Sequence, residues 1–233
     1  MLDKLPIKIA NRINKYVDST QSKIEIVKTT NAFNLKKDSD LIANLAIVNN
    51  IRRINKFHEI VNKSLNQEGI YLSCSETLEE RRTRVRAKTP FGFKNIVRTI
   101  DFIYKRVIPK LPIFKNIYFS LTGGNNRVIS KPETLGRIIS CGFSVLEYFE
   151  YNNLLYVISK KVKEPDYNMS PSYGPLFKMN RVGFKGEIIG VYKMRTMYPY
   201  SEYCQDLIVK ENKLSQSGKV ANDYRLTTWG RIF

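Results

Sequence analysis

The residues of this sequence that could do chemistry are cations spread over its last stretch, residues 174–233. They are Arg181, Lys193, Arg195, Arg225 and Arg231. Arginine can bind a phosphate through two parallel hydrogen bonds, whereas lysine acts as a point charge. A phosphoryl-transfer site needs fixed cations of this kind, because negative charge must be stabilised while the phosphoryl group moves. Taken alone, the same stretch also fits an ordinary basic β-hairpin, in which 177–182 pairs with 188–197 around Gly183 and Gly186.

Glycines, aromatic residues and threonines accompany these cations in ordered blocks. The blocks are Gly174-Pro-Leu-Phe177, Arg181-Val-Gly183, Gly186, Tyr192-Lys-Met-Arg-Thr-Met197 and Asp223-Tyr-Arg-Leu-Thr-Thr-Trp-Gly-Arg231. In this order they resemble the bacterial sugar transferase family, the monotopic phosphoglycosyl transferases. The matching residues are Gly174, Pro175, Phe177, Arg181, Val182, Gly183, Gly186, Tyr192, Lys193, Arg195, Thr196, Met197, Asp223, Arg225, Thr227, Gly230 and Arg231. Met194 stands where the family usually has phenylalanine, which is a mild apolar change.

The resemblance implies an enzyme of surface polysaccharide biosynthesis. Such an enzyme transfers a sugar 1-phosphate from a nucleotide diphosphate sugar to undecaprenyl phosphate. The resemblance also implies an aspartyl intermediate, and Mg²⁺ in the full-length family. In this reading the five cations named above face substrate phosphates.

Two features of the family pattern are missing from the sequence. A Leu-Asp-Glu-Leu-Pro block should follow Phe233 closely, and no Asp-Glu dipeptide occurs in the chain. A long apolar re-entrant helix should precede Gly174, and a polar stretch stands there instead. We therefore expect a truncated and inactive chain, which has no catalytic residue and holds no metal ion by itself.

The charge balance also bears on function. The chain has 39 Lys+Arg against 21 Asp+Glu, a formal net charge of +18. This charge attracts polyanions, which could be nucleic acid, an anionic membrane surface or phosphorylated small molecules, and it also fits a merely solvated basic surface. Nucleic acid is the weakest of these partners, because no helix-turn-helix, RNA-recognition or zinc-finger signature is present. The alternative function is therefore a non-catalytic basic module that docks a membrane surface or a partner glycosylation enzyme.

The cysteines and the single histidine narrow the chemistry further. Cys74, Cys141 and Cys204 form no CxxC pair, and His58 is the only histidine. A zinc site and Ser-His or Cys-His catalysis are therefore not expected. The cysteine usage fits a reducing cytosol. No run approaches about 18 apolar residues, so we expect a cytoplasmic chain without a transmembrane helix, with peripheral attachment to the inner membrane face left open.

The first 163 residues predict an alternation of helices and strands. Strands are expected at 23–27, 70–74, 143–151 and 154–162, helices at 51–65 and 130–142, and either a strand or a helix start at 40–48. Gly69 suits the left-handed end of the first helix, and Ser130 with Glu133 predicts a capping box. The layout resembles the second half of a class I methyltransferase fold. Its glycine-rich cofactor loop has no counterpart here, so methyl transfer is not expected.

Two basic segments lie between these helices. The charge run of 77–86 predicts a solvated helix face. Residues 93–107 are aromatic and apolar at helical spacing, and we expect this helix to pack on the domain core. A helix that lies on a membrane is the alternative, because Lys94, Arg98, Lys105 and Arg106 flank the apolar positions.

Together these observations predict an α/β fold. A partial Rossmann-like, methyltransferase-like domain is expected at 1–163, closed by an antiparallel hairpin. A linker follows at 164–173, and the leading portion of a sugar transferase domain, a small α+β fragment, occupies 174–233.

Overall fold

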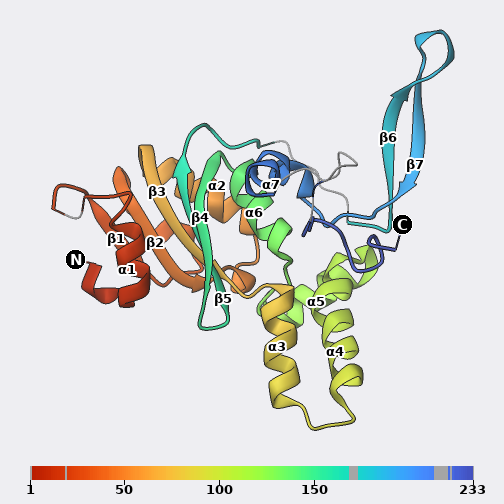
Figure 1. Ribbon diagram of the computed structural model, residues 1–233, viewed down its shortest axis with the longest axis horizontal. Coiled ribbons are helices and arrows are strands. Elements are labelled where there is room, and N and C mark those ends of the chain that lie inside the picture. Colours follow the sequence, from red (N-terminus) through yellow and green to blue (C-terminus); the bar gives the residue numbers. More distant parts are fainter. Residues whose placement is uncertain (1, 19, 168–172, 213–219, 221, 233) are drawn as a thin grey trace.

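The computed structural model describes residues 2–18, 20–167, 173–212, 220 and 222–232. It shows a mixed α/β fold, with a twisted five-stranded sheet, a helical projection and a two-stranded arm (Figure 1). The strands are β1 (Ile24–Val27), β2 (Ser39–Ile47), β3 (Leu65–Ser75), β4 (Phe143–Tyr151), β5 (Leu154–Lys161), β6 (Leu176–Val182) and β7 (Ile188–Met194). The α-helices are α1 (Ile7–Ile13), α2 (Ile54–Ser64), α3 (Leu78–Lys88), α4 (Lys94–Phe102), α5 (Pro112–Thr122), α6 (Lys131–Ser140) and α7 (Gln205–Glu211).

The order of strands in the main sheet is β1-β2-β3-β5-β4. β1, β2 and β3 are parallel, whereas β5 is antiparallel to both β3 and β4. The final hairpin therefore folds back so that its second strand lies between β3 and β4. Asn152 and Asn153 form the hairpin turn with φ of 50° and 57°. A two-residue turn of type I′ requires positive φ at both central residues. This sheet is the predicted partial Rossmann-like arrangement, and the stretch 40–48 is a strand.

Alternating residues of the central strands bury opposite faces of the sheet. Ile42 and Tyr71 join the core beneath α2 and α6, whereas Leu41 and Leu72 join a second core beneath α1. His58 of α2 is buried in the first core, where its ring lies edge-on to Tyr71. Burial lowers the pKa of His58 to about 3, so the side chain is a neutral part of the core.

Two predictions about helix ends are wrong in detail. α2 ends at Ser64, and Gly69 lies inside β3 rather than at the helix end. β3 begins at once because Leu65 already pairs with Ser39 of β2, and the left-handed residue is Glu68. At α6, Ser130 Oγ accepts a hydrogen bond from the Glu133 amide at 3.4 Å, as an N-cap should. The Glu133 carboxylate does not complete the box, because it is surrounded by cations instead.

The segment 78–122 forms a helical projection beside the sheet (Figure 1). α3 and α4 lie side by side and are tied by Arg81, whose guanidinium donates to Asp101 at 2.6 and 2.7 Å. A π-helical turn, η4 (Ile103–Val107), and a short 3-10 turn, η5 (Ile108–Lys110), lead from α4 to α5. α4 has no buried residue, so the expectation that 93–107 packs on the core is wrong for this helix.

The C-terminal part contains the predicted hairpin and a helix that returns to the sheet domain. β6 and β7 pair antiparallel from Leu176 with Met194 to Val182 with Ile188. The 3-10 turn η7 (Ser201–Cys204), which precedes α7, lies against α6, and Cys204 belongs to the core beneath it. Of the predicted linker 164–173, residues 168–172 lie outside the described residues. No helix in the described part of the chain combines the length and hydrophobicity that a bilayer crossing needs.

Candidate functional site

Several sequence blocks of the C-terminal part meet at one place in the structure. The Thr196 carbonyl oxygen accepts hydrogen bonds from the amide and the hydroxyl of Thr227, at 2.8 and 2.9 Å. Met197 and Leu226 form an isolated antiparallel bridge beside this contact. A methyl group added to Gly230 would overlap the same Thr196 carbonyl, so the close approach requires glycine.

The block that begins at Gly174 joins the same place through Arg195. The Arg195 amide donates to the Pro175 carbonyl at 2.7 Å, and its Nε donates to the Gly174 carbonyl at 3.0 Å. The Arg195 guanidinium also lies over the ring of Phe177, 5.2 Å from its centroid. Three separate sequence blocks therefore converge around Arg195 and Thr196.

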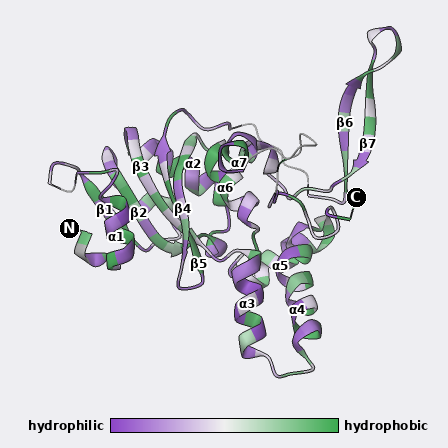
Figure 2. Ribbon diagram, in the orientation of Figure 1, coloured by the Kyte–Doolittle hydropathy of each residue, from purple (hydrophilic) through white to green (hydrophobic). Residues whose placement is uncertain are grey.

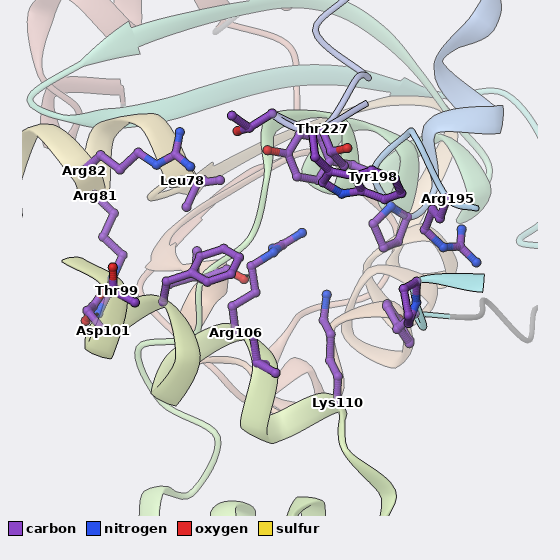
Figure 3. Close-up of a pocket in the computed structure, with 18 of the residues that line it drawn as sticks. Leu78, Arg81, Arg82, Thr99, Asp101, Arg106, Lys110, Arg195, Tyr198 and Thr227 are labelled. Atoms are coloured by element: carbon purple, nitrogen blue, oxygen red, sulfur yellow. Dashed lines mark hydrogen bonds and ion pairs between the residues drawn. The ribbon is translucent and has the colours of Figure 1, made fainter. Parts of the chain in front are cut away.

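A cavity of about 700 Å³ lies between these blocks and the helical projection. It opens beside the carboxyl end of β3, where Leu78 begins α3, and the carboxyl ends of parallel strands are where open α/β sheets bind ligands. Figure 3 shows the side chains of Arg106 and Lys110 directed into this space, with Arg195 and Tyr198 across from them. The lining residues are Leu78, Arg81, Arg82, Val85, Arg98, Thr99, Asp101, Phe102, Arg106, Val107, Lys110, Leu111, Val128, Tyr173, Gly174, Pro175, Arg195, Met197, Tyr198, Pro199, Thr227, Thr228 and Trp229.

Most of the surface that lines this cavity is apolar, and most of its charged side chains are positive. Its cations are Arg81, Arg82, Arg98, Arg106, Lys110 and Arg195. Asp101 is the one carboxylate among the described lining residues, and it is already paired with Arg81. Arg81 also pairs with Glu76 at 3.1 Å, so this arginine stabilises the projection by holding two carboxylates. The remaining cations leave a net positive cavity whose walls include Phe102, Met197 and Trp229.

Behind the cavity, Glu133 anchors several cations at once. Its carboxylate lies 3.2 Å from Arg106, 3.6 Å from Lys110 and 2.9 Å from Arg137. Burial alone would raise the pKa of Glu133, but the three cations outweigh this and hold it far below its ordinary value. Burial lowers the pKa of Lys110 to about 7, with Arg106 and Arg137 acting in the same direction and Glu133 opposing them.

The predicted phosphate-binding residues fall into three groups. Arg195 lines the cavity. Arg181 and Lys193 are exposed on the β6–β7 arm, away from it. Arg225 is buried and binds Asp223 at 2.6 Å as well as Gln205, whereas Arg231 is exposed beside a neighbouring cavity of about 510 Å³. The structure therefore does not bring the five cations together.

Sequence reasoning missed Arg82, Arg98, Arg106 and Lys110 as site residues. They come from the helical projection, which is separated from the C-terminal blocks along the chain. The available signals were the charge run of 77–86, which we interpreted as a solvated helix face, and the basic flank of residues 93–107, which we interpreted as a helix packed on the core or lying on a membrane. The matched residues Met197 and Thr227 do line the cavity, while Tyr192 is exposed on β7.

The described residues do not fit the Mg²⁺ ion that the family resemblance implies. No group of three His, Cys, Asp or Glu side chains in the described part of the chain could hold a metal. The carboxylate of the cavity, Asp101, is bound to Arg81.

Comparison with family models and with curated proteins finds no match. Among solved structures, a possible exported protein from Bordetella parapertussis is similar at a TM-score of 0.34 and 13% identity, over 57% of this chain and 43% of that one. A protein named LaPhzM is similar at a TM-score of 0.38 and 10% identity, over 66% of this chain and 55% of that one. The chain thus spans about half the length of these structures. The α/β fold is shown by the strand order of the sheet itself.

Proposed function

We propose that the cavity binds the phosphate end of a polyprenyl phosphate, as the acceptor side of a sugar-phosphate transferase of surface polysaccharide biosynthesis. One observation carries this proposal. Arg195, from the family-like blocks, lines the same cavity as Arg106 and Lys110, and most of the cavity surface is apolar. A phosphate ester with a hydrocarbon tail needs both surfaces, because its head is anionic and its tail is driven out of water.

The parent reaction in this proposal takes a sugar 1-phosphate from a nucleotide diphosphate sugar to undecaprenyl phosphate. This chain contributes binding and orientation of the phosphate, and it supplies no carboxylate nucleophile, because the sequence has no Asp-Glu dipeptide. A polyprenyl chain partitions into the bilayer, so the proposal includes peripheral attachment to the inner face of the cytoplasmic membrane.

The ligand proposal is tested with farnesyl phosphate, a short polyprenyl phosphate. Trp229 is the single tryptophan of the chain and lines the cavity, so its fluorescence reports occupancy. We expect a saturable change for the wild-type chain, and roughly tenfold weaker binding for Arg195→Ala, since one charge-assisted contact is lost. Arg181→Ala is the matched control, because that arginine belongs to the same family pattern but lies outside the cavity. Equal weakening by both variants would contradict the assignment of the site.

Catalysis is tested separately with a radiolabelled nucleotide sugar and undecaprenyl phosphate in detergent. We expect the purified chain to transfer no label to the lipid fraction. Steady transfer would overturn the view that this chain only binds.

A further inference from the structure

The helical projection carries an unusually apolar outer surface. On α4 and η4 the exposed apolar side chains are Phe93, Ile96, Val97, Ile100, Ile103 and Tyr104. Their spacing of three and four residues places them along one side of the helix. On α5 the exposed set is Ile113, Phe114, Ile117 and Leu121, which again follows helical spacing. Figure 2 shows these hydrophobic stretches as green bands on α4 and α5.

An aromatic contact connects the first of these stretches with α5. The ring of Tyr104 on η4 packs edge-on against the buried ring of Tyr118 on α5, with 5.6 Å between centroids. Phe91, in the turn that precedes α4, is almost fully exposed. Exposed apolar side chains thus run from the end of the projection along α4 and η4, and a further exposed set lies on α5.

Positive charge accompanies this surface. Lys94, Lys105 and Lys115 of the segment 91–122 lie outside the cavity lining, whereas Arg98, Arg106 and Lys110 line the cavity, and the acidic side chain of the segment is Asp101. Asp101 is neutralised by Arg81 of α3. The neighbouring helix α3 adds the exposed Arg86 and Lys88 in its last turn, whereas Arg82 lines the cavity and Arg84 pairs with Glu76.

We propose that the outer surface of α4 and α5 docks onto an anionic lipid bilayer and lies in its interface without crossing it. Amphipathic helices with apolar residues on one side and Lys and Arg beside them bind such interfaces, by burying apolar area and by attraction to anionic headgroups. A second copy of this chain is disfavoured as the occupant, because association would bring two strongly basic surfaces together.

Docking in this way connects the bilayer with the cavity. α4 contributes Arg98, Thr99 and Phe102 to the cavity, and Ile96 and Ile100 to the outer surface. One helix therefore separates the lipid-facing side from the cationic cavity. This connection rests on the proposed function, whereas the docking itself does not.

Vesicle co-sedimentation of the full chain tests the docking. The probes are vesicles of phosphatidylcholine alone and vesicles with added phosphatidylglycerol. The test variant is Ile113→Glu with Ile117→Glu, at positions that are 80% and 59% exposed and whose change should leave the fold intact. The matched control is Val182→Glu with Phe184→Glu on the β6–β7 arm, at 79% and 85% exposure. Circular dichroism of both variants checks that the fold is retained.

We expect the wild-type chain to sediment with the anionic vesicles, less so at high salt, and the α5 variant to bind roughly tenfold more weakly or worse. The control variant should bind like the wild type. Docking is overturned if the α5 variant sediments like the wild type, if the control loses as much binding, or if α5 mediates only self-association. Farnesyl phosphate binding by the α5 variant is measured in parallel. If the α5 variant loses vesicle binding, and neither the wild type nor either variant binds farnesyl phosphate, docking is supported and the proposed ligand is rejected.

Discussion

The carbonyl oxygen of Thr196 accepts hydrogen bonds from both the amide and the hydroxyl of Thr227, which lies 31 residues further along the chain. This contact joins two sequence blocks that carry the family resemblance. It also places Arg195 beside the cavity, because Arg195 directly precedes Thr196. Because the blocks lie together beside one cavity, they form a candidate site and are not separate basic stretches.

Replacing Gly230 with alanine should separate these blocks. The new methyl group would overlap the Thr196 carbonyl, and we expect a loss of roughly 1–3 kcal/mol in unfolding free energy, since the backbone must shift. Urea unfolding followed by the fluorescence of the neighbouring Trp229 measures this loss. Gly174→Ala is the control, because a methyl group there meets nothing nearer than 3.5 Å. Equal stability of the two variants would show that the close approach does not matter.

Removing the charge of Glu133 should be costly. Glu133→Gln leaves Arg106, Lys110 and Arg137 without the buried carboxylate that compensates them, so we expect about 3–5 kcal/mol of destabilisation. The lowered pKa of Glu133 means that its contribution is present above the ordinary value of 4.5 and is lost only as the pH falls below it. Chemical denaturation at neutral pH measures the effect. The exposed Glu150→Gln should change stability by no more than about 0.5 kcal/mol.

Lys110 should make stability depend on pH between about 7 and 9. Its pKa is lowered to about 7 in the folded chain, so above that pH the unfolded state binds more protons than the folded one. Stability should therefore rise with pH in this range, by at most about 1.4 kcal/mol per pH unit. The groups that face Lys110 are Glu133, Arg106, Arg137 and Tyr173. Denaturation of Lys110→Met at pH 7 and pH 9 should give a smaller difference than the wild type, and an unchanged difference would reject this role.

Arg225 and Arg231 should behave differently although both match the family pattern. Arg225→Ala leaves the half-buried Asp223 without this arginine and removes the bond to Gln205, so we expect roughly 2–3 kcal/mol of destabilisation. Arg231→Ala removes an exposed side chain and should leave stability unchanged. Thermal unfolding of the two variants distinguishes these roles. A stable Arg225→Ala chain that binds farnesyl phosphate poorly would instead make Arg225 a ligand contact.

Local sequence signals determined most of the elements of the sheet domain. The Asn152-Asn153 turn predicted the terminal hairpin, and the apolar spacing of residues 51–65 predicted α2, because both depend on neighbours within a few residues. The Glu133 prediction failed for the opposite reason. Its carboxylate is held by Arg106 and Lys110, which are far from α6 along the chain, and no local pattern indicates such partners.

For the candidate site, the sequence by itself determined that residues 174–233 carry ordered blocks of glycine, threonine and arginine, and that the chain is strongly basic. Only the tertiary structure decided which cations share a cavity. Arg195 lines the same cavity as Arg106 and Lys110, because the helical projection lies beside the carboxyl end of β3. The segments paired through Thr196 and Thr227 lie there too. Arg181 shares the sequence pattern but is carried away from the cavity on the β6–β7 arm, since distance in space depends on long-range packing and not on spacing in the chain.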